Sequence, residues 1–353
     1  MIKQKNLLLK AARQIHYLPG LFICVLLSCT PEKHRQIEAG FYFWKTELKL
    51  KTSEKGIIRE LPVHTLYLRL FDIVMRNGKP LPAGMLRAAP VEDTVLNYVP
   101  VVFITQSCLY DVQESQLPDL AQKTAALMRE LSRRYQLHPA EIQIDCDWTA
   151  ATRARYFRLL SLLKAQPFFK SRTLSCTIRM HQVKYLVSSG IPPVDKGLLM
   201  VYNMGDLKKF GGQNSIFEEA DARRYVANMK QYPLPLDIAL PLYHWAVLFK
   251  GNSFRGIVYN ISRSDFDRHL LQHLSGNMYR VQTGMRVAGY DFPEGTAIRF
   301  EAPGKKELER IARFMSDRLN QEHTRVSFFH LDSASLSKFS IDDMRDILDA
   351  FRK

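Results

Sequence analysis

Residues 141–149 read E-I-Q-I-D-C-D-W-T, and this stretch decides how the rest of the chain is interpreted. It predicts a β-strand, and the i, i+2 spacing of Asp145 and Asp147 places both carboxylates on one face of that strand. A carboxylate removed from water needs a compensating partner, so two unpaired acids inside a sheet would be costly. We therefore expect both acids at the end of a strand, where their repulsion raises one of the two pKa values. Alternatively, they cap the following helix or pair with Arg153 or Arg155.

Seven further apolar stretches share the β-forming composition of this strand. The eight predicted strands are residues 41–44, 64–73, 98–105, 141–148, 173–180, 196–204, 235–243 and 325–331. Amphipathic helices are predicted at residues 118–135, 150–164, 216–230, 305–319 and 340–352. Continuous apolar strands are typical of a parallel sheet covered by helices. Eight alternating units predict an α/β protein with a closed (β/α)8 TIM barrel rather than an open doubly wound sheet.

A small β-rich insertion is expected after the seventh strand. Residues 246–300 contain short aromatic pieces punctuated by glycine, which predict hairpins. A ninth strand candidate, T-A-I-R-F-E-A at residues 296–302, is assigned to this insertion. The barrel is then divided into residues 39–245, which hold its first seven strands, and residues 301–353, which complete it.

The N-terminus has the features of a bacterial export signal. Four basic residues and no acid precede an apolar core over residues 18–27, which is too short to span a bilayer. The core ends in L-L-S-C, which resembles the lipobox of bacterial lipoproteins. We expect removal of residues 1–28, lipidation of Cys29 and a tether over residues 29–38, which would place the protein in the cell envelope on an undetermined side. Ordinary secretion or an uncleaved anchor is the alternative.

The chain is basic, with a formal net charge of +15 at pH 7. Loss of the predicted signal would remove four basic residues and no acid, leaving +11. This charge favours anionic glycans or a membrane surface as partners, unless it only sets solubility. Nucleic acid is not expected as a partner, because the sequence has no basic repeat and no recognisable binding module.

Several kinds of chemistry are not expected from this sequence. Cys108, Cys146 and Cys176 have no paired or metal-like spacing, and Cys146, between the two acids, faces the opposite side as a small core residue. The histidines and carboxylates are too dispersed for a metal site. No nucleotide-binding glycine motif and no serine-nucleophile motif occurs, so we predict neither a cofactor nor serine hydrolase chemistry.

Polar and aromatic side chains follow the predicted strands where these would meet at the barrel mouth. Aromatic rings stack on the C–H faces of sugars, and sugar hydroxyls need directional partners, so the mixture favours a carbohydrate ligand. The predicted catalytic residues are Asp145, Asp147 and Asp72. The predicted substrate-binding residues are Trp44, Arg69, Trp148, Arg179, His181, Tyr202, Asn203, Tyr243 and Trp245.

Some of these residues also have plain structural interpretations. Trp44 and Trp148 could pack between the barrel and its helices instead of contacting a sugar. Arg69 and Arg179 are as consistent with neutralising the acids, and His181 with a structural hydrogen bond.

The motifs resemble those of family 18 glycoside hydrolases, the chitinase-type barrels. The fourth strand of that family carries D-x-x-D-x-D-x-E, and Asp145 and Asp147 match its last two aspartates. Its sixth strand often reads M-x-Y-D, matched here by M-V-Y-N at residues 200–203, and P-L-Y at residues 241–243 resembles the end of its seventh strand. The family also has an insertion after strand seven. The resemblance implies a TIM barrel that acts on a glycan.

Three departures from the family pattern concern its acidic residues. Thr149 stands where the family places the glutamate that protonates the glycosidic oxygen, and Ile142 replaces the first aspartate of the motif. Asn203 replaces the acid of the sixth strand. In these respects the chain looks nearer to uncharacterised bacterial envelope barrels that carry an I-D-x-D strand.

Three functions remain open from the sequence. The protein could be a glycosidase-like enzyme that uses Asp145 or Asp147 opposite Asp72 or Glu47. It could be an inactive barrel that binds glycans. It could also be a scaffold lipoprotein of an envelope assembly. The sequence leaves the oligomeric state, the sugar and the linkage open.

Overall fold

The structure of the chain is a computed structural model that describes residues 35–91 and 95–352. The predicted signal, the predicted lipidation site Cys29 and the first part of the predicted tether lie outside the described residues. Within them, no helix combines the length and the apolar character that crossing a membrane requires.

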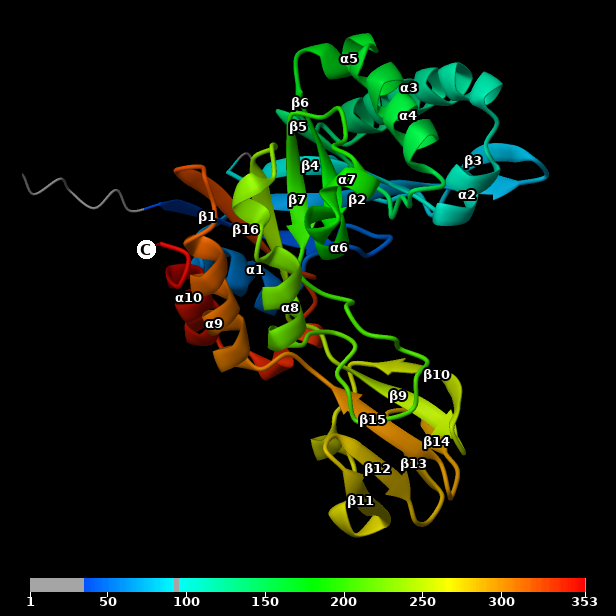
Figure 1. The fold of residues 1–353 in the computed structure, drawn as a ribbon, viewed down its shortest axis with the longest axis vertical. Coiled ribbons are helices and arrows are strands. Elements are labelled where there is room, and N and C mark those ends of the chain that lie inside the picture. Colours follow the sequence, from blue (N-terminus) through cyan, green and yellow to red (C-terminus); the bar gives the residue numbers. More distant parts are fainter. Residues whose placement is uncertain (1–34, 92–94, 353) are drawn as a thin grey trace, which may run out of the picture. The chain divides into compact units, whose positions relative to one another are not determined.

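Eight parallel strands close into a barrel, as the sequence predicted (Figure 1). In order around the ring they are β1 (Gln36–Phe43), β2 (Val63–Arg76), β4 (Asn97–Ile104), β5 (Glu141–Asp145), β6 (Thr173–Arg179), β7 (Lys196–Met200), β8 (Leu236–Pro241) and β16 (His323–Phe329). β1 pairs with β2 on one side and with β16 on the other, which closes the ring. The predicted strands differ from these mainly at their ends.

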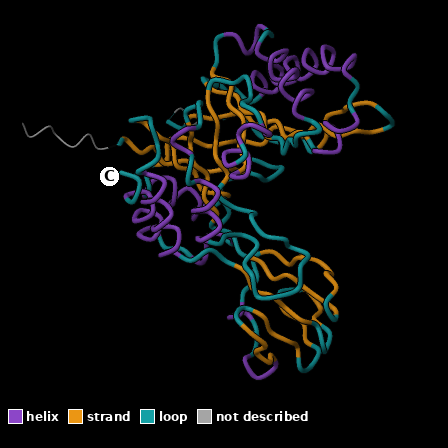
Figure 2. The backbone as a smooth tube through the Cα atoms, viewed as in Figure 1, coloured by secondary structure: helices purple, strands orange, loops and turns teal. Residues whose placement is uncertain are grey.

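Helices occupy the connections between the strands (Figure 2). The five predicted helices are α3 (Leu117–Arg134), α4 (Arg153–Lys164), α8 (Glu219–Val226), α9 (Lys305–Ser316) and α10 (Ile341–Asp349). Helices that were not predicted are α1 (Thr52–Glu60), α2 (Gln106–Asp111), α5 (Pro167–Lys170), α6 (Met180–Lys184) and α7 (Leu186–Ser189). The 3-10 turns are η1 (Glu114–Gln116), η2 (Met229–Gln231), η3 (Arg263–Asp265), η4 (Arg268–Leu270) and η5 (Ser335–Lys338).

A hairpin extends β2 beyond the barrel. β3 (Lys79–Ala83) runs antiparallel to the last residues of β2. The turn is Asn77-Gly78, and both residues have positive φ, at 50° and 68°. Asn-Gly suits such a turn because these two residue types tolerate the left-handed conformation that tight hairpins require. The hairpin was not predicted from the sequence.

The insertion after β8 forms sheets of its own. Five antiparallel strands, in the order β10-β9-β15-β12-β11, form one sheet, and β13 and β14 form a second. Their bounds are β9 (Trp245–Lys250), β10 (Ser253–Tyr259), β11 (Leu271–Ser275), β12 (Met278–Val281), β13 (Met285–Val287), β14 (Tyr290–Phe292) and β15 (Ala297–Glu301). β15 is the ninth strand candidate, and it pairs with β9 and β12 rather than within the barrel.

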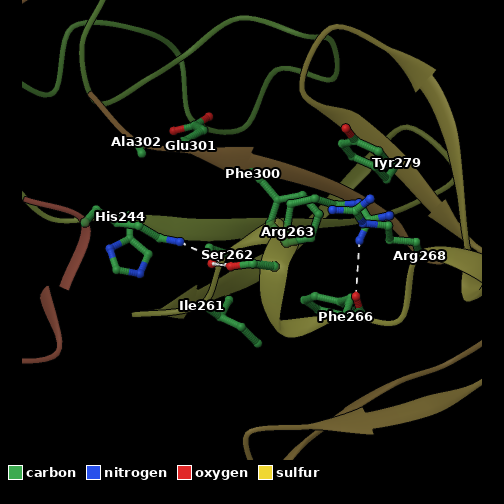
Figure 3. A pocket seen from close by; sticks show the side chains of 12 residues that line it. His244, Ile261, Ser262, Arg263, Phe266, Arg268, Tyr279, Phe300, Glu301 and Ala302 are labelled. Carbon is green, nitrogen blue, oxygen red and sulfur yellow. Dashed lines mark hydrogen bonds between the residues drawn. The ribbon is translucent and has the colours of Figure 1, made fainter. Parts of the chain in front are cut away.

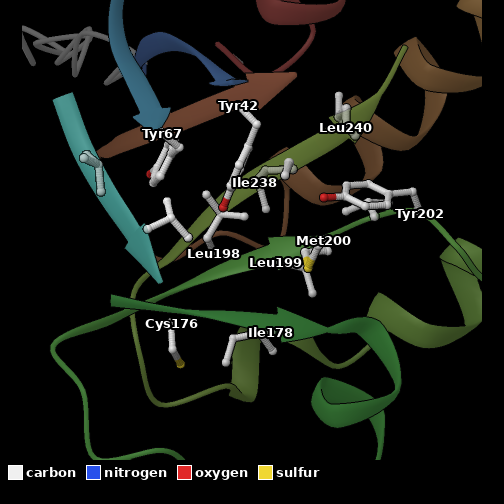
Figure 4. Packing of buried hydrophobic residues seen from close by; sticks show 14 of the residues in the cluster. Tyr42, Tyr67, Cys176, Ile178, Leu198, Leu199, Met200, Tyr202, Ile238 and Leu240 are labelled. Carbon is white, nitrogen blue, oxygen red and sulfur yellow. The ribbon is translucent and has the colours of Figure 1, made fainter. Parts of the chain in front are cut away.

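Buried side chains fill the middle of the barrel (Figure 4). The rings of Tyr42 and Tyr67 stack at 4.6 Å between centroids, and the Tyr42 hydroxyl donates to Gln143 Oε1 at 2.5 Å. Leu198 and Ile238 are 1% exposed or less and belong to the same cluster. This packed layer separates the two ends of the barrel, which carry different sets of charged residues.

The amino-terminal end of the barrel holds a network of charges. Arg325 contacts Glu38 at 2.9 Å, Glu141 at 2.8 Å and Asp237 at 3.7 Å. Lys196 lies 2.9 Å from Glu141 and 2.6 Å from Asp237. Each base therefore bridges at least two acids, as a buried charge requires.

Candidate functional site

Asp145 is a buried acid at the carboxyl end of the barrel. It is the last residue of β5 and is 5% exposed, and Oδ1 accepts a hydrogen bond from the Thr177 hydroxyl at 2.6 Å. Burial and the charge of Asp147 raise the pKa of Asp145 to about 6. Asp145 can therefore take up and release a proton near neutral pH, as the spacing of the two acids predicted for one of them.

Asp147 follows β5 and is held by Arg179 at the end of β6. Arg179 Nε donates to Asp147 Oδ1 at 2.5 Å, and Nη2 donates to Oδ2 at 2.8 Å. The Asp147 side chain is 43% exposed and that of Arg179 is 20% exposed. Arg179 Nη1 is buried and has no hydrogen-bond partner. The guanidinium thus fixes Asp147 with two of its nitrogens and leaves the third without a bond.

Asp72 is paired in a similar way. Arg69 Nε donates to Asp72 Oδ1 at 2.7 Å, and Nη2 makes a second, closer contact with the same carboxylate. Ala83 of β3 lies opposite Asp72 in the hairpin. The guanidinium of Arg69 also lies 5.5 Å from the ring centre of Trp44. A bidentate pair of this kind holds Asp72 to its own strand.

Phe329 lies at the centre of an aromatic cluster in the mouth. Its ring centroid is 5.9 Å from that of Tyr42, 5.8 Å from Trp44, 5.5 Å from Tyr202 and 5.7 Å from Tyr243. Trp44 and Phe329 are half-buried, so part of each ring remains available to a ligand. Phe329 was not predicted as a site residue, because the predicted strand ran to residue 331 whereas β16 ends at Phe329.

The ends of β7 and β8 bring Tyr202, Asn203 and Tyr243 together. The Tyr243 hydroxyl donates to Asn203 Oδ1 at 2.6 Å. Asn203 is exposed and has a φ of 57°, a left-handed conformation that asparagine tolerates better than most residues. The Tyr202 hydroxyl is buried and has no hydrogen-bond partner. The mouth therefore has two buried polar groups without a hydrogen-bond partner, this hydroxyl and Arg179 Nη1.

Trp148 and Trp245 lie away from the exposed part of the mouth. Trp148 is 1% exposed, stacks on Tyr156 at 5.1 Å and donates from Nε1 to the Ser189 carbonyl. Trp245 is 8% exposed, and its Nε1 donates to Glu301 Oε2 at 2.7 Å. A role for either ring in stacking on a ligand would require this packing to open.

The remaining predicted residues lie at the rim. His181 in α6 is exposed, and partial burial of its ring and the charge of Arg179 lower its pKa. Thr149 is also exposed, and its backbone N–H donates to the Thr152 hydroxyl at 2.9 Å. Glu47 makes only a long contact of 3.9 Å with Arg87. Position 149 thus carries a hydroxyl, whereas the family motif has the carboxylate of a glutamate there.

Thiols and possible metal ligands are the remaining reactive groups of the described residues. Cys108, Cys146 and Cys176 are free and buried, and burial raises the pKa of each thiol. Among residues 35–91 and 95–352, no group of three or more His, Cys, Asp or Glu side chains could hold a metal ion.

Comparison with known proteins finds similarity in fold only. No protein-family model matches the sequence, and no curated protein matches it. The spore cortex-lytic enzyme SleL of Bacillus cereus aligns with 91% of this chain and 75% of its own, with a TM-score of 0.55 and 16% identity. A variant of a family 18 chitinase from Cycas revoluta, solved in complex with (GlcNAc)4, aligns with 89% of this chain and 99% of its own, with a TM-score of 0.52 and 11% identity.

A third similar structure is the chitinase-like agglutinin of Robinia pseudoacacia. It aligns with 88% of this chain and 99% of its own, with a TM-score of 0.50 and 10% identity. At these identities the likeness concerns the course of the backbone. The chain therefore has the barrel fold of the family 18 chitinases, as its strand motifs predicted.

Proposed function

We propose that the mouth of this barrel binds a neutral glycan and does not cleave it by the family 18 mechanism. The observation that carries the proposal is the state of the two acids after β5. Asp147 accepts two hydrogen bonds from Arg179. Asp145 is buried and accepts a hydrogen bond from the Thr177 hydroxyl. Asp147 is held in an ion pair and Asp145 is buried, so neither is positioned to protonate a leaving group, and Thr149 cannot do so at neutral pH.

Binding is supported by the groups that remain available. Trp44 and Phe329 offer half-buried ring faces, which suit the C–H faces of a sugar. Arg179 Nη1 and the Tyr202 hydroxyl are buried polar atoms without partners, and such atoms are costly unless a ligand or water satisfies them. A sugar hydroxyl can act as donor or acceptor and so could bond to either group.

The similar structures support the same class of ligand. The Cycas revoluta chitinase was solved with (GlcNAc)4, and the Robinia pseudoacacia protein is a chitinase-like agglutinin. A tetramer of N-acetylglucosamine is therefore the first probe to use.

The test measures binding and cleavage in one mixture. The full-length chain is titrated with (GlcNAc)4, and the sugar is then analysed for shorter products. We expect binding without products. Trp44→Ala should weaken binding by about 1–3 kcal/mol because it removes the exposed ring face. Tyr290→Ala, an exposed aromatic residue of the insertion, is the matched control and should bind as the unaltered chain does. Unchanged binding by the Trp44 variant would contradict the proposal.

One observation favours glycoside hydrolysis as a second candidate. A pKa of about 6 lets Asp145 exchange a proton at neutral pH. Hydrolysis of (GlcNAc)4 that is lost in Asp145→Asn would support this candidate in place of binding alone.

We also propose that the chain is an envelope lipoprotein anchored at Cys29. Support comes from the apolar segment and the L-L-S-C motif at residues 26–29. Expression of the full chain with a radiolabelled fatty acid should label the protein, and Cys29→Ala should abolish the label. Labelling that persists in this variant would contradict the proposal.

A further inference from the structure

A cavity of about 700 Å³ lies between the insertion and the barrel segments that contain His244 and η5 (Figure 3). The insertion contributes residues 261–264, 266 and 268, and parts of β12 and β15, to its wall. The barrel side contributes Lys338 of η5 and His244, which precedes β9. Cavities of this size at the junction of two substructures are typical of small-ligand sites.

The cavity is lined by three basic side chains, those of Arg263, Arg268 and Lys338. In the part of the chain that the structure describes, none of the three forms an ion pair. One acid, Glu301, lines the cavity, but it already accepts from Arg299 at 2.5 Å and from Ser215 at 2.6 Å. The charge of Asp265, beside the cavity, reaches His244, but the three bases outnumber this acid. The cavity therefore carries net positive charge and favours an anionic ligand.

The buried histidine of the cavity wall needs a hydrogen-bond donor. His244 is 3% exposed, and its Nδ1 is buried without a partner. Burial and the charge of Lys338 lower the pKa of His244, so the ring is neutral at pH 7. A hydrogen bond from the ring to the backbone of Ser335 raises the pKa. Because Nδ1 has no partner, we assign this bond to Nε2. Nδ1 is then an acceptor, which suits a hydroxyl and does not suit a bare anion.

An aromatic surface completes the cavity. Phe300 lies 5.2 Å from Phe266 and 5.6 Å from Tyr279, measured between ring centroids. Figure 3 shows His244 at one end of the cavity and Tyr279 and Arg268 at the other, so a ligand that meets both ends must be longer than a single small ion. Ring faces, a hydroxyl acceptor and separated cations together fit a chain of acidic sugars.

We propose that this cavity is a second saccharide site, selective for an oligosaccharide whose sugars carry carboxylates. The bases Arg268 and Lys338 bind the carboxylates, His244 Nδ1 accepts from a hydroxyl, and the rings of Tyr279 and Phe300 contact the sugar. This site is separate from the barrel mouth and does not depend on glycan binding there.

The test compares an acidic probe with a neutral one. The full-length chain is titrated calorimetrically with trigalacturonate and with its carboxyl-reduced, neutral counterpart. We expect roughly tenfold tighter binding of the acid, the gain expected from one or two charge-assisted hydrogen bonds. Arg268→Gln combined with Lys338→Gln should remove this preference. Both side chains are exposed, so the variant should keep the thermal unfolding midpoint of the unaltered chain.

A matched control separates the site from general charge attraction. Arg255→Gln combined with Arg280→Gln removes the same charge from exposed positions of the insertion that do not line the cavity. This control should keep the preference for the acid. Equal losses in the two double variants, or equal binding of acid and neutral probe by the unaltered chain, would overturn the proposal.

Two further outcomes are decisive. Displacement of trigalacturonate by inorganic phosphate, at matched ionic strength, would show an anion site without sugar selectivity and would also overturn the proposal. Trp44→Ala should leave trigalacturonate binding unchanged while it weakens binding of (GlcNAc)4 at the mouth. The proposal for the mouth and the proposal for the cavity can therefore fail independently.

Discussion

Each end of the barrel carries a cluster of three acids and two bases, and the two clusters are arranged differently. The amino-terminal end has the acids Glu38, Glu141 and Asp237 with the bases Lys196 and Arg325. The mouth has the acids Asp72, Asp145 and Asp147 with the bases Arg69 and Arg179. At the amino-terminal end Lys196 and Arg325 each bridge two or more acids, whereas Arg69 and Arg179 at the mouth each pair with a single acid.

This difference appears in the proton affinities. Burial alone would raise the pKa of Glu141, but Lys196 and Arg325 lower it below its usual value. Asp145 forms no ion pair among the described residues, and its pKa rises to about 6. The amino-terminal network is therefore complete in itself. The mouth keeps a protonatable acid and unbonded polar atoms, which is the expected condition of a surface that meets a ligand.

The largest expected effect comes from breaking the complete network. Arg325→Met should lower the free energy of unfolding by about 3–5 kcal/mol because it leaves three acids with one base. Arg345→Met, at an exposed arginine of α10 paired with Asp342, is the matched control and should change stability by less than about 0.5 kcal/mol. Urea unfolding measures both. A similar small change in the two variants would show that the network does not stabilise the barrel.

A smaller effect of opposite sign is expected at the mouth. The folded-state pKa of Asp145, about 6, lies above its ordinary value of 3.8, so the folded state binds this proton more tightly than the unfolded state does. The resulting stabilisation is complete below about pH 4 and is lost as the pH rises through about 6. An asparagine at this position would stay neutral at every pH, so the variant avoids the cost of a buried carboxylate. Asp145→Asn should therefore be more stable than the unaltered chain by about 1–3 kcal/mol at about pH 8.

Glu141→Gln provides the contrast to this variant. The pKa of Glu141 is lowered, so its contribution to stability is present above its ordinary pKa and is lost as the pH falls. The variant should therefore be less stable than the unaltered chain at about pH 8. Stability curves of both variants from about pH 4 to 8 check the two signs. Destabilisation by Asp145→Asn at the upper end of this range would contradict the contrast between the two ends.

The smallest effect is expected at the exposed pair of the mouth. Asp147→Asn should lower the free energy of unfolding by less than about 1 kcal/mol, because the Asp147 side chain is 43% exposed and solvent screens its pairing with Arg179. The variant should also release no shorter products from (GlcNAc)4, like the unaltered chain. Urea unfolding and product analysis test the two statements. A large loss of stability would place this pair with the amino-terminal network instead.

The barrel could be predicted from the sequence because its strands are buried on both faces. Continuous apolar runs such as residues 98–105 then mark strands directly, and β4 spans Asn97–Ile104. The hairpin of β3 was missed because Lys79–Ala83 contains two prolines and has little apolar character, although Asn77-Gly78 was a turn signal.

The surroundings of the predicted site residues could be foreseen only in part. Alternation along 141–149 puts Trp148 on the same face as Cys146, toward the helices, so its burial against Tyr156 follows from the rule that paired the two acids. The ion pair of Arg179 with Asp147 links the ends of β6 and β5, and its geometry depends on the register of these two strands. A single sequence gives the residue types of such a pair but not its geometry.

The central claim, that the mouth is the glycan site, can be tested with the three tryptophans of the chain. Trp44 lies at the mouth, whereas the indole N–H groups of Trp148 and Trp245 are bonded to Ser189 and Glu301 in packed surroundings. The full-length chain labelled with 5-fluorotryptophan gives one fluorine signal for each ring, and Trp44→Phe assigns the first. On saturation with (GlcNAc)4, the signal of Trp44 should shift while the other two stay in place. An unmoved Trp44 signal under saturating sugar would contradict the account.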